Sequence, residues 1–128
     1  GSNSTALGTE ALATNTSATA VGDTSKASGA NSTAVGTNTT ASGANSVSVG
    51  NQSDATSQNA LAAGNFAQAT GTNSTAVGNK AAASGASSIA SGDISIASKD
   101  QASAYGFNSK AQGLAATAIG ANSSASAC

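Results

Sequence analysis

The stretch NSTAVGTNTTASGA, residues 31–44, begins with a hexamer that returns unchanged as NSTAVG at residues 73–78. Related hexamers, NSTALG and NSVSVG, start at residues 3 and 45. Cutting the chain from Asn3 gives nine units of fourteen residues without any insertion or deletion. Because a fixed period is the sequence signature of a repeat architecture, we number the positions of each unit as columns 1 to 14.

Two columns hold a single residue type in all nine units: column 6 is always glycine and column 11 is always alanine. Column 13 also holds glycine in five units, so glycines recur about every seven residues. Recurrent glycines between short periodic segments are typical of turns. We expect the column 6 glycines to form turns: Gly8, Gly22, Gly36, Gly50, Gly64, Gly78, Gly92, Gly106 and Gly120.

The segments between the glycines alternate with a period of two. Columns 2 and 4 hold small residues such as Ser32 and Ala34, whereas columns 3 and 5 hold larger ones such as Thr33 and Val35. Columns 9 and 11 are small again, while column 10 accepts residues as different as Lys26 and isoleucine. Alternation with β-branched residues predicts strands, with the small columns facing inward and column 10 facing solvent.

Each unit is therefore predicted to be one coil of two short strands, stacked on the next coil. The expected fold is all-β: a parallel β-solenoid that forms a single domain over residues 1–128, in which each repeat contacts mainly its neighbours. With strands about 4.8 Å apart, nine coils make a rod roughly 43 Å long.

Composition excludes a conventional hydrophobic core. The chain has two Phe, one Tyr and no Trp or Met, and most of its 38% hydrophobic residues are alanine. A methyl group buries far less apolar area than a leucine or phenylalanine side chain. Order must therefore come from backbone hydrogen bonds and from close packing of small residues.

Column 5 points away from the small-residue interior and is mostly apolar. A long apolar stripe on a soluble protein usually marks an interface, so we expect several copies of the chain to bury it against each other. The predicted interface residues are Leu7, Val21, Val35, Val49, Val77, Tyr105 and Ile119.

The repeated hexamers closely resemble the NSVAIG signature of the YadA-like heads of trimeric autotransporter adhesins from Gram-negative bacteria, over residues 3–128. The resemblance implies a left-handed parallel β-roll of nine 14-residue coils, assembled as a homotrimer. It further implies a head exposed at the bacterial cell surface and outer membrane that attaches to host cells or to extracellular matrix such as collagen, fibronectin or laminin. The stalk and the membrane anchor of the family have no counterpart in this sequence, which we interpret as a fragment of a longer fibre.

Several positions depart from the family pattern. Column 13 holds Asn15, Ser57, Lys99 and Ala127 in place of glycine, and Ser91 interrupts column 5. The least typical unit, residues 87–100, has isoleucines in columns 8 and 10. Two explanations stay open for this unit: a local shift of register, or coverage of the isoleucines by a neighbouring chain.

The same inventory argues against several classes of function. There is no His, the lone Cys128 is the last residue, and the four aspartates are spread over nine units. We therefore expect no catalytic site, no bound metal and no cofactor. Four lysines without any arginine do not predict binding to nucleic acid, and no apolar run is long enough to predict direct membrane insertion. A single cysteine also excludes a disulfide framework.

Bulky apolar residues in outward or turn columns are candidates for ligand contact. They either bind a host molecule or fill gaps between chains and around irregular turns, and the sequence leaves both interpretations open. The lysines Lys26, Lys80 and Lys110 are more typical of solubility than of an acidic partner. The candidate ligand-binding residues are Phe66, Ile94, Ile96 and Phe107.

Two alternative interpretations agree less well with the sequence. An ice-binding or purely structural solenoid would use the partial threonine ladder in column 3, but ice binding would also require threonine in column 5, where this chain places aliphatic residues. A disordered Ser/Thr-rich stalk conflicts with the absence of proline and with the unbroken repeat. The threonines of column 3 are Thr5, Thr19, Thr33, Thr75 and Thr117.

Overall fold

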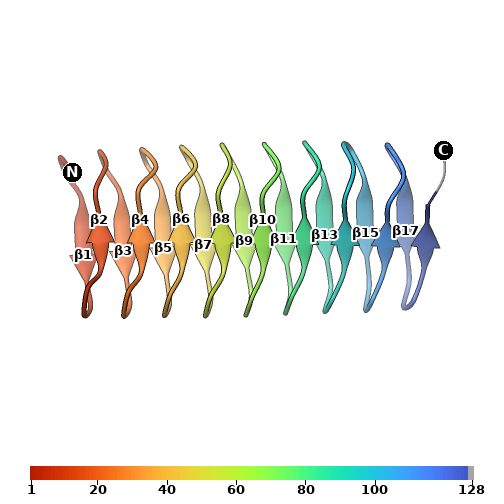
Figure 1. The fold of residues 1–128 in the computed structure, drawn as a ribbon, viewed down its shortest axis with the longest axis horizontal. Coiled ribbons are helices and arrows are strands. Elements are labelled where there is room, and N and C mark those ends of the chain that lie inside the picture. Colours follow the sequence, from red (N-terminus) through yellow and green to blue (C-terminus); the bar gives the residue numbers. More distant parts are fainter. Residues whose placement is uncertain (127–128) are drawn as a thin grey trace.

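The computed structural model describes residues 1–126 and shows one straight row of stacked coils (Figure 1). Each fourteen-residue unit contributes one strand of three residues and one of two residues. The protein is a parallel β-solenoid of nine turns, as the repeat predicts.

The odd-numbered strands pair in sequence order into one nine-stranded parallel sheet, the odd-strand sheet, built from columns 3–5. Its strands are β1 (Thr5–Leu7), β3 (Thr19–Val21), β5 (Thr33–Val35), β7 (Val47–Val49), β9 (Leu61–Ala63), β11 (Thr75–Val77), β13 (Ile89–Ser91), β15 (Ser103–Tyr105) and β17 (Thr117–Ile119).

The even-numbered strands form a second nine-stranded parallel sheet, the even-strand sheet, from columns 10–11. Its strands are β2 (Leu12–Ala13), β4 (Lys26–Ala27), β6 (Thr40–Ala41), β8 (Asp54–Ala55), β10 (Gln68–Ala69), β12 (Ala82–Ala83), β14 (Ile96–Ala97), β16 (Lys110–Ala111) and β18 (Ser124–Ala125).

Every strand pair keeps the fourteen-residue register. Thr33 lies beside Val47, for example, and its neighbours follow in step. The atypical unit of residues 87–100 does not deviate, because Ile89 pairs with Ser103 and Ile96 with Lys110. Of the two explanations that the sequence left open, the local register shift is therefore wrong, and the altered side chains of this unit are accommodated on an unaltered backbone.

The core between the two sheets contains only small side chains. Columns 2 and 4 face columns 9 and 11, and the bulkiest fully buried side chain is Thr39. Two serines bond across the gap, Ser48 and Ser53, whose hydroxyl oxygens are 2.7 Å apart. Some other buried hydroxyls donate to the glycine carbonyl three residues earlier, as Ser32 Oγ does to Gly29 O at 2.7 Å. The Oγ atoms of Ser46, Ser74, Ser88 and Ser109 are buried without a hydrogen-bond partner among the described residues. The predicted assignment of inward columns is confirmed.

Two tight turns per coil connect the sheets, and both place a residue in the left-handed region. In one turn the column 9 amide donates to the column 6 carbonyl, as in Ser25 N to Gly22 O at 3.3 Å. In the other the column 2 amide donates to the column 13 carbonyl, as in Ser46 N to Gly43 O at 3.2 Å. The third residue of each turn, in column 8 or column 1, has φ between 52° and 60°, as in a turn of type II.

The two glycine columns are required for different reasons. Column 6 glycines have φ values from 110° to 141°, a region that essentially only glycine populates. Column 13 glycines lack positive φ, but a Cβ on Gly71 would lie 2.0 Å from the carbonyl oxygen of Gly85 in the next coil. The exceptions in column 13 are isolated: Ser57, for instance, lies between coils that carry Gly43 and Gly71.

Candidate interaction surfaces

The outer face of the odd-strand sheet, which we call the apolar face, consists of the column 3 and column 5 side chains of all nine coils. None of these side chains is charged. Away from the ends of the rod, Val49, Val77 and Tyr105 are each 40–41% exposed, while Val21 and Val35 are half-buried. The predicted column 5 stripe therefore lies on one continuous surface along the rod.

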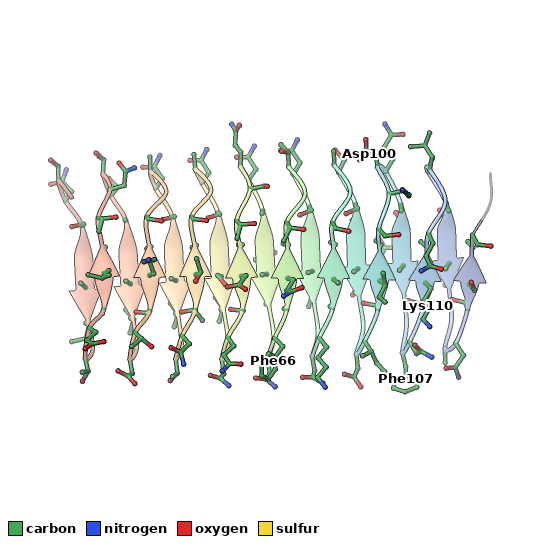
Figure 2. The ribbon with its side chains drawn as sticks, in the orientation of Figure 1. Phe66, Asp100, Phe107 and Lys110 are labelled. Carbon is green, nitrogen blue, oxygen red and sulfur yellow. The ribbon has the colours of Figure 1, made fainter. Side chains whose placement is uncertain are left out.

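The outer face of the even-strand sheet, the polar face, has the opposite character. It presents columns 10 and 12, with the charged residues Lys26, Asp54 and Lys110 in the first and mostly Ser and Thr in the second, from Thr14 to Ser126. Figure 2 shows the labelled Lys110 on this sheet. The polar face thus carries charged side chains, whereas the apolar face carries only aliphatic, tyrosine, threonine and serine side chains.

The structure brings three of the four candidate ligand-binding residues to one edge of the rod. Phe66 and Ile94 occupy column 8 and Phe107 occupies column 7, in the turn that follows column 6. Their exposed fractions are 42%, 36% and 50%, and Figure 2 shows both phenylalanines at the same edge. We call this surface, formed by columns 7 and 8, the column 7–8 edge.

Ile96 does not join this group. It lies in β14, where column 10 belongs to the polar face, and it is half-buried. Two further exposed leucines were not among the sequence candidates: Leu12, on β2, and Leu114, at the opposite edge, are 46% and 59% exposed. Leu12 could have been found from the sequence, because its column 10 also accepts lysine and aspartate and was assigned to solvent. Leu114 lies in column 14, which is not buried in any described coil but which the sequence pattern did not assign.

Two of the apolar residues on the column 7–8 edge have a backbone conformation that is unusual for their type. Phe66 has φ 59° and Ile94 has φ 52°, in a region that suits Asn and Gly and is unfavourable for bulky and β-branched residues. Asn38 occupies the same column in an earlier coil. Two apolar residues therefore stand where the backbone disfavours them and outside the fully buried core.

Asparagine side chains line both edges in ladders. In column 1, Asn31, Asn45 and Asn59 bond in series, each Nδ2 of the first two donating to the Oδ1 of the next coil at 3.2 Å, and the series continues to Asn73. A second ladder in column 7 runs from Asn51 to Asp93. The Asn amides that bond along the rod are engaged within the chain, which is a structural role.

Residues 1–126 contain no group of three or more His, Cys, Asp or Glu side chains that could hold a metal ion. The same residues enclose no pocket and include no helix long and apolar enough to span a membrane. Cys128, which the sequence singled out, lies outside the described residues.

The repeat matches a known family along most of the chain. A family model described as YadA head domain repeat (2 copies) matches residues 1–25, 27–53, 55–81 and 83–109, so each match spans about two coils. A search among curated proteins found no significant match. The fourteen-residue coils, their glycine turns and these four matches agree: the chain belongs to the YadA head-domain repeat family, non-enzymatic structural modules in the heads of trimeric autotransporter adhesins.

Proposed function

We propose that this chain is the head of a trimeric adhesin, displayed at the outer surface of a Gram-negative bacterium, that attaches the cell to host tissue. Three copies form a left-handed β-roll trimer by burying their apolar faces around a common axis. The predicted interface residues Leu7, Val21, Val35, Val49, Val77, Tyr105 and Ile119 all belong to that face.

The observation that carries this proposal is the contrast between the two outer faces of one rod. The eighteen column 3 and column 5 positions of the nine coils contain no charged residue, whereas the opposite face carries lysine and aspartate. An uncharged apolar strip along a whole molecule of this size is an interface by its extent. Burying it around an axis leaves the polar face and both edges exposed to partners.

The molar mass in solution tests the assembly. Light scattering after size exclusion, under reducing conditions that silence Cys128, is expected to give three times the 11.7 kDa of one chain. A folded monomer would contradict the trimer, because the apolar face would then be in contact with water. The rod would in that case be a free-standing solenoid, and a thermal hysteresis assay would test the ice-binding alternative.

The column 7–8 edge is the surface that we assign to host contact. Phe66, Ile94 and Phe107 lie there, outside the apolar face, and two of them keep an unfavourable backbone conformation without being buried in the core. Unfavourable conformations of this kind persist where the residue serves another purpose. Ile96, on the polar face, would contribute separately. Three copies per head and many heads per cell multiply weak contacts into avidity.

Binding to matrix proteins tests the function. Immobilised collagen, fibronectin and laminin, and whole host cells, are each exposed to the folded head. We expect saturable binding to at least one, weakened several-fold in the variant Phe66→Asn/Ile94→Asn/Phe107→Asn. The matched control is Leu114→Asn, which removes an apolar side chain of greater exposure from the opposite edge and is expected to leave binding unchanged. If the folded trimer binds none of these proteins or cells, the proposed function is wrong.

A further inference from the structure

The side chains of the apolar face compensate for one another in size within single coils. Where column 5 shrinks to Ala63 in β9, column 3 of the same coil holds Leu61. Where column 5 is Ser91 in β13, column 3 is Ile89. Where column 5 grows to a tyrosine in β15, column 3 is a serine. The other six coils pair threonine or valine in column 3 with valine, leucine or isoleucine in column 5.

Size compensation implies a partner surface at a fixed distance. A side chain that projects into water has no neighbour that limits its volume, so its size needs no match. A close-packed interface, in contrast, penalises both voids and overlaps. The compensation therefore indicates that columns 3 and 5 of one coil level fill the same space.

Rotational symmetry brings those two columns together across subunits. In a ring closed by rotation about an axis parallel to the rod, the interface is heterologous: different edges of the same face meet. Strands of the apolar face run around the axis in one sense, so the column 5 side of one copy meets the column 3 side of the next. Closed rotation involves no axial shift, so the contacting residues come from the same coil.

Displacing the copies by one coil destroys the size match. If column 5 of one copy faced column 3 of the following coil in its neighbour, Ser91 would face Ser103 and leave a gap. Val77 would face Ile89, and the two large side chains would overlap. Moving column 5 against the preceding coil sets the large Tyr105 against the large Ile89. Only the undisplaced register pairs each large residue with a small one.

We infer that the trimer interface, on which this inference rests, is keyed coil by coil: column 3 of one copy packs on column 5 of the same coil in the neighbouring copy. The pairs Leu61 with Ala63, Ile89 with Ser91 and Ser103 with Tyr105 act as three keys in the fifth, seventh and eighth coils. The first two have their large residue in column 3, and the third has it in column 5. They fix the axial register and select identical copies over chains with another sequence of column sizes.

Cysteine cross-linking tests this register in the trimer. The double variant Leu61→Cys/Ala63→Cys, in a Cys128→Ser background, is oxidised and run on a denaturing gel without reductant. We expect a covalent trimer, because the thiol introduced at position 61 of each copy then reaches the thiol at position 63 of the neighbouring copy. Bonding within one chain is disfavoured, since residues two apart on a strand are about 6.8 Å from each other with parallel side chains. The matched control, Leu61→Cys/Val77→Cys, is displaced by one coil and is expected to stay monomeric on the gel.

Each contrary outcome has a distinct meaning. Light scattering of the Cys128→Ser parent under reducing conditions comes first, and a monomer there would overturn the proposed trimer and this inference with it. Both cysteine variants are then checked in the same way, so that only assembled trimers are oxidised. An intact trimer in which the displaced pair cross-links better would overturn the register alone. So would a trimer in which the same-coil pair forms bonds within single chains, or forms none, because columns 3 and 5 would then not meet between copies.

A size exchange gives a second measurement that does not depend on disulfide geometry. Ala63→Leu is expected to overfill its level and to lower the melting temperature of the trimer. Adding Leu61→Ala at the same level should restore most of the loss. Adding Thr75→Ala, in the following coil, should not, and equal rescue by Thr75→Ala would overturn the same-coil register.

Discussion

Two residues of every coil, in columns 1 and 8, adopt a left-handed backbone conformation that most side chains avoid. Asparagine is among the few residues that tolerate this region, and it fills five of the nine column 1 positions. There it also bonds along the rod, as Asn59 does to Asn73 at 2.8 Å. The asparagine that opens the repeated hexamer is thus explained by the turn it makes.

Ile94 is the residue least suited to its backbone, and replacing it should stabilise the protein. It is β-branched and has φ 52°, so Ile94→Asn is expected to raise the free energy of unfolding by about 1 kcal/mol per chain. Ile96→Asn is the matched control: the chemical change is the same and the coil is the same, but the residue lies in β14, where isoleucine is favoured.

Thermal unfolding followed by circular dichroism, at equal protein concentration, checks this pair. The melting temperature should rise for Ile94→Asn and fall or stay constant for Ile96→Asn. If Ile94→Asn lowers the melting temperature, Ile94 makes contacts that outweigh its strain, and a packed site for its side chain would have to be sought.

At the scale of the strand, the fold depends on a core that has room only for methyl and hydroxymethyl groups. Ala83 in β12 is fully buried, and its neighbours in column 11, such as Ala69 and Ala97, are fully buried too. Backbone hydrogen bonds between coils, such as the one from Thr33 N to Ser46 O at 2.9 Å, run along both sheets. Stability is thus distributed over many equivalent bonds rather than concentrated in a few large side chains.

Enlarging one buried column should be far more damaging than enlarging its outward neighbour. Ala83→Leu is expected to force the sheets apart and to lower the free energy of unfolding by about 3 kcal/mol or more. Ala82→Leu, in the same strand but on the polar face, is expected to change it by less than about 0.5 kcal/mol. Denaturant unfolding of both variants measures the difference, and equal costs would refute the inward assignment of column 11.

Period and alternation were enough to predict the solenoid, its register and the inward columns, because nine copies of one pattern average out the ambiguity of any single strand. The left-handed residues were not predicted, since φ depends on turn geometry that glycine spacing alone does not define. The column 7–8 edge was only partly predicted: Phe66, Ile94 and Phe107 lie along it, but Ile96 lies two residues beyond Ile94 on another surface. A turn separates them, and sequence distance does not show on which side of a turn a side chain lies.

At the scale of the whole molecule, each coil is itself two similar halves of seven residues. Columns 1 and 8 are both left-handed, columns 4 and 11 are both buried, and columns 6 and 13 both favour glycine. The halves differ on their outer faces, because only columns 3–5 carry the apolar face. The turn positions and the inward columns therefore repeat every half turn, although of the glycines only those in column 6 have positive φ, while the surface chemistry repeats every full turn.

Deletions of one unit and of half a unit should therefore have different consequences. Removing residues 73–86 takes out one full turn, so the apolar face stays continuous, and we expect a trimer shortened by about 4.8 Å. Removing residues 73–79 rotates all later coils by half a turn, which transfers their apolar columns to the opposite side of the rod. Each half of that rod would bury its stripe in a different direction, so three copies cannot close around one axis. Light scattering and small-angle X-ray scattering should show a trimer for the first variant and none for the second. A half-unit deletion that still forms a trimer of normal stability would show that continuity of the apolar face is not what holds the copies together.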